Sequence, residues 1–111
     1  TTVHVEFFEH EADQQTAQEL RLACKANLAA CALKLEEFYA AAGYCTELLK
    51  DDPKNIKALY RRAQALLGTK DFEDASKDCQ RVLELEEGNT EAKTLMQRIA
   101  RAEKEEAKRQ R

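Results

Sequence analysis

Residues 22–55 read LACKANLAACALKLEEFYAAAGYCTELLKDDPKN, and residues 56–89 read IKALYRRAQALLGTKDFEDASKDCQRVLELEEGN. Aligned without a gap, these two segments share seven identical positions, which are Ala29/Ala63, Leu33/Leu67, Phe38/Phe72, Ala41/Ala75, Cys45/Cys79, Leu49/Leu83 and Asn55/Asn89. Most of the shared residues are small or apolar and recur at helical spacing, as on a packed helix face. The chain therefore contains an internal repeat with a period of about 34 residues.

Each unit divides into two helices around a short turn. In the second unit, Asn55 is a good N-cap for a helix that runs from Ile56 to about Leu67. Gly68 suits the end of that helix, and Asp71 is placed to cap the next one. The first unit is expected to hold helices near residues 17–34 and 38–50, which are followed by the break Asp51-Asp52-Pro53.

The two ends of the chain are expected to be helical as well. Residues 90–111 follow the cap Asn89 as one uninterrupted helix that closes the stack, with Leu95, Met96 and Ile99 buried. Residues 1–20 are interpreted as the remnant second helix of a preceding repeat, although the alternation of Val3, Val5, Phe7 and Phe8 would also suit a strand. Because such arrays need about three repeats for stability, we expect a piece of a longer protein or self-association through the incomplete first repeat.

Composition excludes several classes of protein. The chain has 111 residues with 43% hydrophobic and 35% charged positions, three glycines and one proline, which favours one all-α domain and excludes an all-β one. A net charge of −3 argues against binding nucleic acid. The absence of a long apolar run or a signal peptide predicts a soluble, cytoplasmic protein with no membrane partner. The four cysteines are expected to be reduced and mostly buried thiols.

The repeat resembles the tetratricopeptide repeat family, whose pattern it meets in two places. The first unit supplies Leu28, Ala29, Ala41, Cys45 and Pro53, and the second supplies Leu59, Ala63, Leu66, Ala75 and Cys79. The chain has Ala for the family's usual Gly, Cys for its second aromatic residue, and Glu87 where Pro would stand. The resemblance implies an α-α superhelix of antiparallel helix pairs, here with two repeats at residues 22–55 and 56–89.

Three polar residues on the first helices of the two units are candidates for binding an anion. Asn27 and Arg61 are one period apart, so they occupy equivalent places on neighbouring helices. Lys57 and Arg61 are four residues apart, and these like charges repel each other unless an anion lies between them. A carboxylate would accept charge-assisted hydrogen bonds from both, with Asn27 as a further donor. The alternative is an ordinary solvated face, on which Arg62 is a bystander, while Tyr60 adjoins the site and is a candidate for lining a peptide groove.

This trio resembles the carboxylate clamp of co-chaperones that bind the C-terminal Glu-Glu-Val-Asp of heat-shock chaperones. Asn27, Lys57 and Arg61 match the last three clamp residues of that family, while the first Lys and Asn have no counterpart here. The sequence of residues 57–65 is most similar to that of large immunophilins, which are peptidyl-prolyl isomerases of the FK506-binding or cyclophilin type. The resemblance implies a module that binds the C-terminal peptide of heat shock protein 90, or of the seventy-kilodalton class, with any isomerase domain upstream.

We expect no catalytic residues, cofactor or metal in this chain. His4 and His10 do not share a helix face, which argues against a metal site, and Cys45 and Cys79 occupy matching apolar places that suit packing. The alternative function is that of a tetratricopeptide scaffold that binds another protein without recognising carboxylates.

Overall fold

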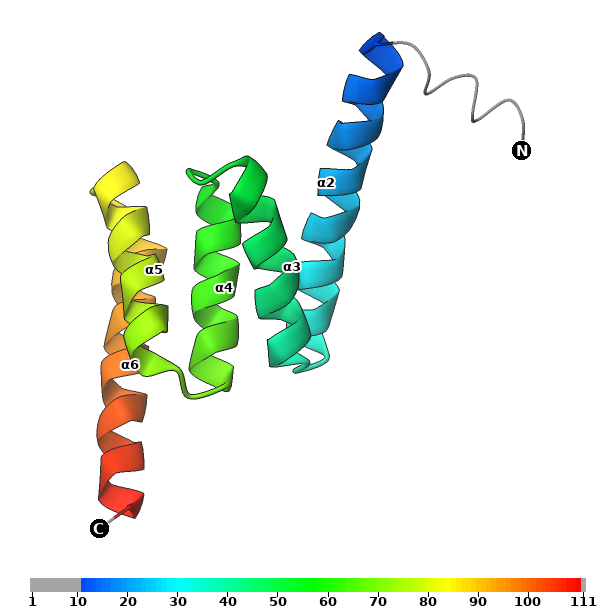
Figure 1. Ribbon diagram of the computed structural model, residues 1–111. Coiled ribbons are helices and arrows are strands. Elements are labelled where there is room, and N and C mark those ends of the chain that lie inside the picture. Colours follow the sequence, from blue (N-terminus) through cyan, green and yellow to red (C-terminus); the bar gives the residue numbers. More distant parts are fainter. Residues whose placement is uncertain (1–10, 111) are drawn as a thin grey trace.

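The structure is a computed structural model that describes residues 11–110, and this part of the chain is built from helices. In chain order they are α2 (Glu11–Lys34), α3 (Phe38–Asp51), α4 (Ile56–Gly68), α5 (Phe72–Leu85) and α6 (Thr90–Arg109) (Figure 1). No strand occurs within residues 11–110. The expected all-α fold of antiparallel helix pairs with a long terminal helix is confirmed.

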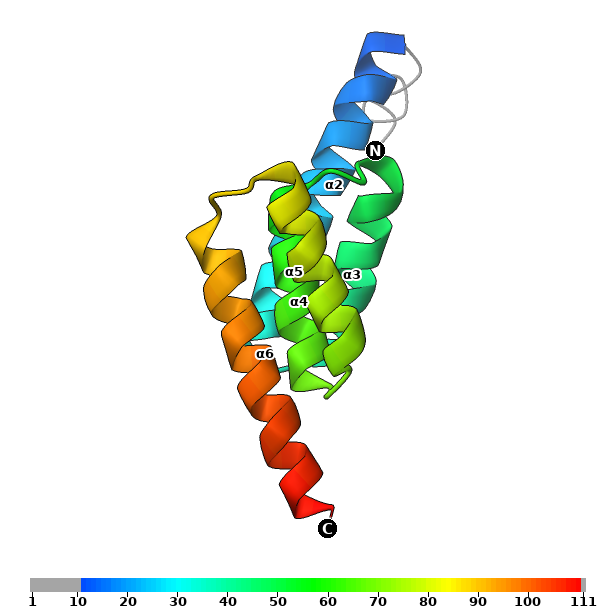
Figure 2. The ribbon, with the colours of Figure 1, turned by 90° about the vertical axis from the view of Figure 1, so that its left-hand side faces the viewer.

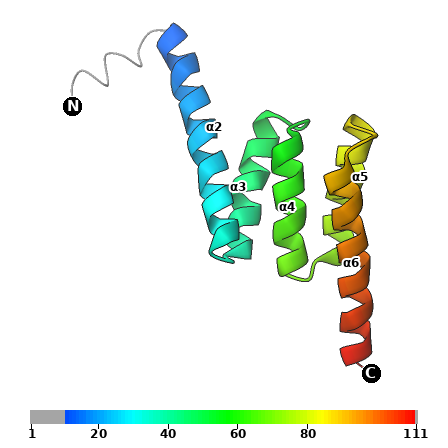
Figure 3. The ribbon, with the colours of Figure 1, turned by 180° about the vertical axis from the view of Figure 1, so that it is seen from behind.

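The helices form two layers. Each packs against the next one along the chain, and α4 also contacts α2 and α6. The first helices α2, α4 and α6 therefore make one layer, and the second helices α3 and α5 make the other (Figures 1 and 3). The beginning of α2 and the end of α6 project beyond this row in opposite directions, which Figure 2 shows from the α6 end.

The turns inside the two units have the same geometry. Glu36 and Lys70, one period apart, both adopt left-handed backbone with φ of 58° and 66°. In each turn the amide that follows the left-handed residue donates to a carbonyl five residues earlier in the chain. Glu37 N–H donates to Ala32 O and Asp71 N–H donates to Leu66 O, both at 2.8 Å. This pattern closes the C-terminal end of a helix. Gly68 is the last residue of α4, but the left-handed position falls two residues beyond it.

The helix caps between the units repeat as well. The side-chain oxygen of Asn55 accepts from Ala58 N–H at 3.0 Å, and that of Asn89 accepts from Ala92 N–H at 2.8 Å. The predicted caps at these two positions are confirmed, and each satisfies an amide that has no partner within its helix. The predicted side-chain cap at Asp71 is wrong, because its carboxylate instead accepts the Thr69 hydroxyl at 2.6 Å.

Small residues make the core. The residues that are fully buried at the repeated positions are Ala29, Ala41, Cys45, Ala63, Ala75 and Cys79, each with 0% exposure. Their short side chains allow neighbouring helices to approach closely. At the far end, Leu95 and Ile99 are each 1% exposed and Met96 packs against the same cluster, which confirms the predicted contacts of the closing helix.

The N-terminal helix is longer than expected. Residues 11–20 were expected to end a separate helix of a preceding repeat, but they continue into α2 without a break. Residues 11–24 contain neither Gly nor Pro, so nothing in this segment interrupts the helix. The expectations for Val3, Val5, Phe7 and Phe8 lie outside the described residues, as do those for His4 and His10.

Neither a membrane-spanning helix nor a cluster of metal ligands occurs in the described part of the chain. None of its helices combines the length and the apolarity needed to cross a membrane. Within residues 11–110 no three His, Cys, Asp or Glu side chains gather in a way that could hold a metal ion.

The contact between Gly68 and Phe38 gives a direct test of the packing between the units. A Cβ atom on Gly68 would collide with the Phe38 ring, so Gly68→Ala should lower the free energy of unfolding by about 1–3 kcal/mol. Gly43 lies inside α3 with nothing near its added Cβ, and Gly43→Ala should raise the free energy by about 0.5–1 kcal/mol. Urea titrations followed by circular dichroism measure both, and equal effects of the two substitutions would contradict the packing described.

Candidate functional site

The predicted clamp residues lie on the first helices of the two units. Asn27 is on α2, and Lys57, Tyr60 and Arg61 are on α4. Asn27 precedes the buried Ala29 by two residues. Two helical steps separate side chains by about 200° around the axis, so the two residues lie on nearly opposite sides of α2. Asn27 is exposed and therefore points away from α3, toward the outer surface of the α2, α4 and α6 layer. We call this surface the first-helix face.

Arg61 connects the two helices. Its Nη1 donates to the backbone carbonyl of Ala26 at 3.4 Å, across the contact between α4 and α2. Ala26 directly precedes Asn27 in the chain, so the guanidinium lies beside the backbone that carries the Asn27 side chain. Lys57 is exposed and lies one turn before Arg61 on the same side of α4. The structure thus brings the three predicted residues to one region of the first-helix face.

The two cations of this region carry uncompensated charge. Within the part of the chain that the structure describes, neither Lys57 nor Arg61 forms an ion pair with a carboxylate. Lys25, by contrast, lies on the α3 side of α2 and pairs with Glu47 at 3.3 Å. The arrangement at Lys57 and Arg61 can therefore accept an anion without first breaking an internal salt bridge.

Tyr60 faces α6 rather than α2. It is half-buried and packs against the core cluster that contains Ala63 and Leu95. Burial, followed by the nearby carboxylate of Glu91, raises the pKa of Tyr60, so its hydroxyl remains a neutral donor at physiological pH. It is one residue from Arg61 but on the flank of α4 that faces α6.

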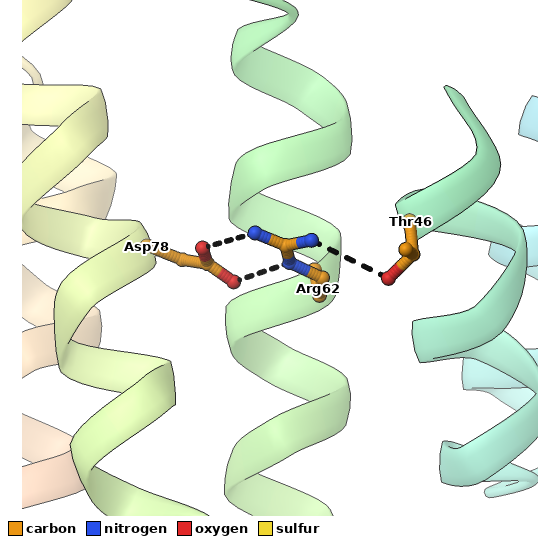
Figure 4. A network of polar contacts seen from close by, with 3 residues as sticks. All are labelled: Thr46, Arg62 and Asp78. Atoms are coloured by element: carbon orange, nitrogen blue, oxygen red, sulfur yellow. Dashed lines mark hydrogen bonds and ion pairs between the residues drawn. The ribbon is translucent and has the colours of Figure 1, made fainter. Parts of the chain in front are cut away.

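Arg62 is part of the framework, which the sequence analysis missed. Its Nε and Nη2 donate to the two carboxylate oxygens of Asp78 at 2.8 and 2.7 Å, and its Nη1 donates to the Thr46 hydroxyl at 3.3 Å (Figure 4). Asp78 is only 5% exposed, and its hydrogen bond raises the pKa of Arg62. This network joins α3, α4 and α5, so Arg62 is not a solvated bystander.

A signal for this ion pair was present in the sequence. Asp78 falls between Ala75, Cys79 and Val82 on the apolar face of its helix, where an ionised carboxylate requires a partner. A cation on the facing helix had to supply that partner. Among the arginines of α4, Arg62 is the one directed toward α5.

The cysteines divide into two pairs. Cys45 and Cys79 are buried, and burial raises the pKa of each thiol from 9.0 to about 11. Both stay protonated near neutral pH, which suits packing and not nucleophilic attack. Cys24 and Cys31 are exposed on α2, so the expectation of mostly buried thiols is wrong for these two.

A sequence profile described as tetratricopeptide repeat matches residues 32–99. The chain belongs to the tetratricopeptide repeat family. This match spans the second predicted repeat unit in full and the first in part, and it covers more than half of the 111 residues. A tetratricopeptide repeat domain is a protein-interaction module and not a catalytic domain.

Similar proteins add detail to this assignment. The chain is 47% identical over 93 residues to human peptidyl-prolyl cis-trans isomerase FKBP4, a match that covers 80% of this chain and 20% of that protein. The chain thus spans about a fifth of the length of the curated relatives it matches. The expected resemblance to the repeat region of FK506-binding immunophilins is confirmed.

Two solved structures share the fold. One is the first TPR of Spaghetti (RPAP3) bound to the HSP90 peptide SRMEEVD, with a TM-score of 0.70, 32% identity, and coverage of 73% of this chain and 64% of that one. The other is the C-terminal TPR-containing domain of a Plasmodium falciparum putative FK506-binding protein, PFL2275c. It has a TM-score of 0.79 at 24% identity and covers 94% of this chain and 73% of that one, which shows a common fold.

The Arg62–Asp78 pair predicts a large loss of stability when one partner is removed. Asp78→Ala leaves a half-buried guanidinium without its carboxylate and should lower the free energy of unfolding by about 2–4 kcal/mol. Lys77→Ala, on the same helix, removes an exposed ion pair with Glu73 and should change the free energy by less than about 0.5 kcal/mol. Urea unfolding of both variants decides the matter, and a small effect of Asp78→Ala would rule out a structural role for the pair.

Proposed function

We propose that this chain binds the acidic C-terminal peptide of heat-shock chaperones through a carboxylate clamp formed by Asn27, Lys57 and Arg61. The observation that carries the proposal is the 3.4 Å contact from Arg61 Nη1 to the carbonyl of Ala26, next to Asn27. It holds a guanidinium, which has no acidic partner within residues 11–110, against the backbone that carries the Asn27 side chain on the neighbouring helix. The spacing suits a ligand that presents carboxylates to both helices.

The role of each residue follows from its chemistry. Lys57 and Arg61 would donate charge-assisted hydrogen bonds to carboxylates of the peptide, and an anion between them would relieve their mutual repulsion. Asn27 would donate to the terminal carboxylate from α2. Tyr60 would offer the edge of its ring to an apolar side chain of the peptide, because it is half-buried beside Arg61.

The similar proteins support the class of ligand. The repeat domain of RPAP3, which is 32% identical to this chain, is bound to the HSP90 peptide SRMEEVD in its solved structure. We therefore propose heat shock protein 90 as the first partner to test, with the seventy-kilodalton class as the second. The similarity to FKBP4 further suggests that the parent protein is a cytoplasmic, immunophilin-like co-chaperone, in which an isomerase domain lies upstream.

Calorimetric titration with the peptide Met-Glu-Glu-Val-Asp tests the clamp. The free-acid peptide should bind, and its C-terminal amide should bind at least about tenfold more weakly, because the amide removes the carboxylate charge. Lys57→Ala and Arg61→Ala should each cause a similar loss. Binding of the free acid should also weaken as the salt concentration rises.

Lys54→Ala is the matched control for these substitutions. Lys54 is exposed and precedes the helix cap Asn55, so its removal changes the net charge equally without touching the clamp. If the amide binds as well as the free acid, or if Lys54→Ala weakens binding as much as Lys57→Ala, the clamp is refuted. A scaffold that binds its partner without recognising carboxylates would then be the better description.

A second surface favours self-association. An exposed side of α2 carries an apolar stripe, which is formed by Leu20, Cys24, Leu28, Cys31 and Leu35. The three leucines of this stripe are 55%, 47% and 69% exposed. One period later, the corresponding residues of α4 include Ala58 and Ala65, which are 1% and 0% exposed, and Arg62, which bonds to Thr46 of α3. The equivalent face of α4 is thus covered by a helix.

We propose that α2 of a second copy covers this stripe. The spacing of the stripe is nearly symmetric about its centre, so an antiparallel copy would set Leu20 against Leu35 and Cys24 against Cys31. Each helix would then bury apolar side chains that are exposed in the single chain. The pairing would be isologous, with the same residues contributed by both copies.

Light scattering coupled to size-exclusion chromatography measures this association. The molar mass should rise toward that of a dimer with increasing protein concentration, and Leu28→Lys should keep the chain monomeric by placing a charge in the centre of the stripe. Gln97→Lys, an exposed position on α6, is the control and should behave as the wild type does. A wild-type mass that stays monomeric at all concentrations would contradict the proposal.

A further inference from the structure

A small cavity opens on the first-helix face, below the clamp. It has a volume of about 230 Å³ and is lined by residues of α2, α3, α4 and α6. It is lined by Leu33, Phe38, Gln64, Leu67, Gly68 and Arg98. This volume is below the roughly 300 Å³ at which small-molecule pockets begin, so the cavity fits one side chain of a larger ligand.

The lining has two kinds of surface. Leu33, Phe38 and Leu67 are half-buried and form an apolar floor. The ring of Phe38 can lie against the backbone at Gly68 because glycine has no Cβ there. Gln64 and Arg98 supply the polar groups, an amide and a guanidinium from two different helices. A side chain with methylene groups and a terminal carboxylate matches this combination.

Arg98 is available for such a carboxylate. It is exposed, and within residues 11–110 it has no ion-pair partner. The residues one turn before and after it on α6 are Thr94 and Ala102, neither of which is acidic. The acidic residues Glu105 and Glu106 lie further along α6 and have partners of their own, as in the contact of Lys70 with Glu106 at 3.2 Å.

The cavity lies on the same side of α4 as the clamp. Lys57, Arg61, Gln64 and Gly68 follow one another at steps of four, three and four residues, which places them along one face of the helix. The centres of the pairs Lys57/Arg61 and Gln64/Gly68 are about seven residues apart, or about 10 Å along the axis. An extended peptide advances about 3.3 Å per residue, so it covers this distance in about three residues.

We infer that the cavity is a second peptide subsite, which takes the side chain of a glutamate three residues before the C-terminal residue. Its methylene groups pack on Leu33 and Leu67, and its carboxylate accepts hydrogen bonds from Arg98 and Gln64. This inference rests on the proposed function, because the clamp fixes the end from which the three residues are counted. The subsite would let the domain select an acidic residue inside the peptide as well as a free C-terminus.

A cycle that combines a protein variant with a peptide variant tests the subsite. The probes are the free-acid peptides Met-Glu-Glu-Val-Asp and Met-Gln-Glu-Val-Asp, titrated calorimetrically into wild type and Arg98→Gln. Arg98→Gln should weaken binding of the first peptide about fivefold and leave the second unchanged. On wild type, the Glu to Gln change in the peptide should itself weaken binding by a similar factor.

Lys104→Gln is the control for loss of charge on α6. Lys104 is exposed on the same helix and does not line the cavity, so binding of both peptides should change by less than about twofold. The subsite is refuted if Arg98→Gln weakens both peptides equally, or if it affects neither while Lys57→Ala still weakens binding. If wild-type binding is absent or does not need the free carboxylate, the proposed function itself fails, and the subsite fails with it.

Discussion

The close approach of neighbouring helices through small side chains is the constraint on which the rest of the structure depends. Ala29, Ala41, Ala63 and Ala75 are all fully buried, and no larger residue would fit at these contacts without separating the helices. This spacing lets α4 contact both α2 and α6. It also allows the Arg61 side chain to reach a carbonyl on α2, from which the site is built. The packing of the core and the geometry of the proposed clamp therefore have the same origin.

Two adjacent arginines of α4 have different roles because the helical period directs their side chains toward different neighbours. Arg61 and Arg62 differ by one step, or about 100° around α4, so they face different neighbours. Arg62 points into the second layer and pairs with the buried Asp78, which neutralises both charges and fixes α5 against α4. Arg61 lies on the first-helix face with its charge uncompensated by any carboxylate of the described residues. Arg62 is therefore available only to the framework, while Arg61 is available to a ligand.

Much of the fold could be predicted from the sequence because the repeat is gapless and its helix caps depend on neighbouring residues. The caps at Asn55 and Asn89 depend only on the three residues that follow, and the structure has both. The missed features depend on contacts between helices. The partner of Arg62 is sixteen residues away on α5. The continuity of α2 through residue 20 follows from the absence of Gly and Pro in residues 11–24, and the repeat pattern, which starts at residue 22, does not describe this segment. The positions of the candidate site residues followed from the period, whereas the cavity at Arg98 is lined by residues of four helices and required their packing.

Charge is distributed unevenly over this acidic chain. Its net charge is −3, yet Lys57, Arg61 and Arg98 all lie on the first-helix face, while many of the carboxylates are exposed elsewhere or paired within the chain. The acidic peptide proposed above would therefore be attracted to this face, which would orient the encounter. Because the cations belong to α4 and α6 and the amide belongs to α2, a peptide that bound all of them would contact the three helices. The order of the helices would thus set the direction of such a peptide across the first-helix face.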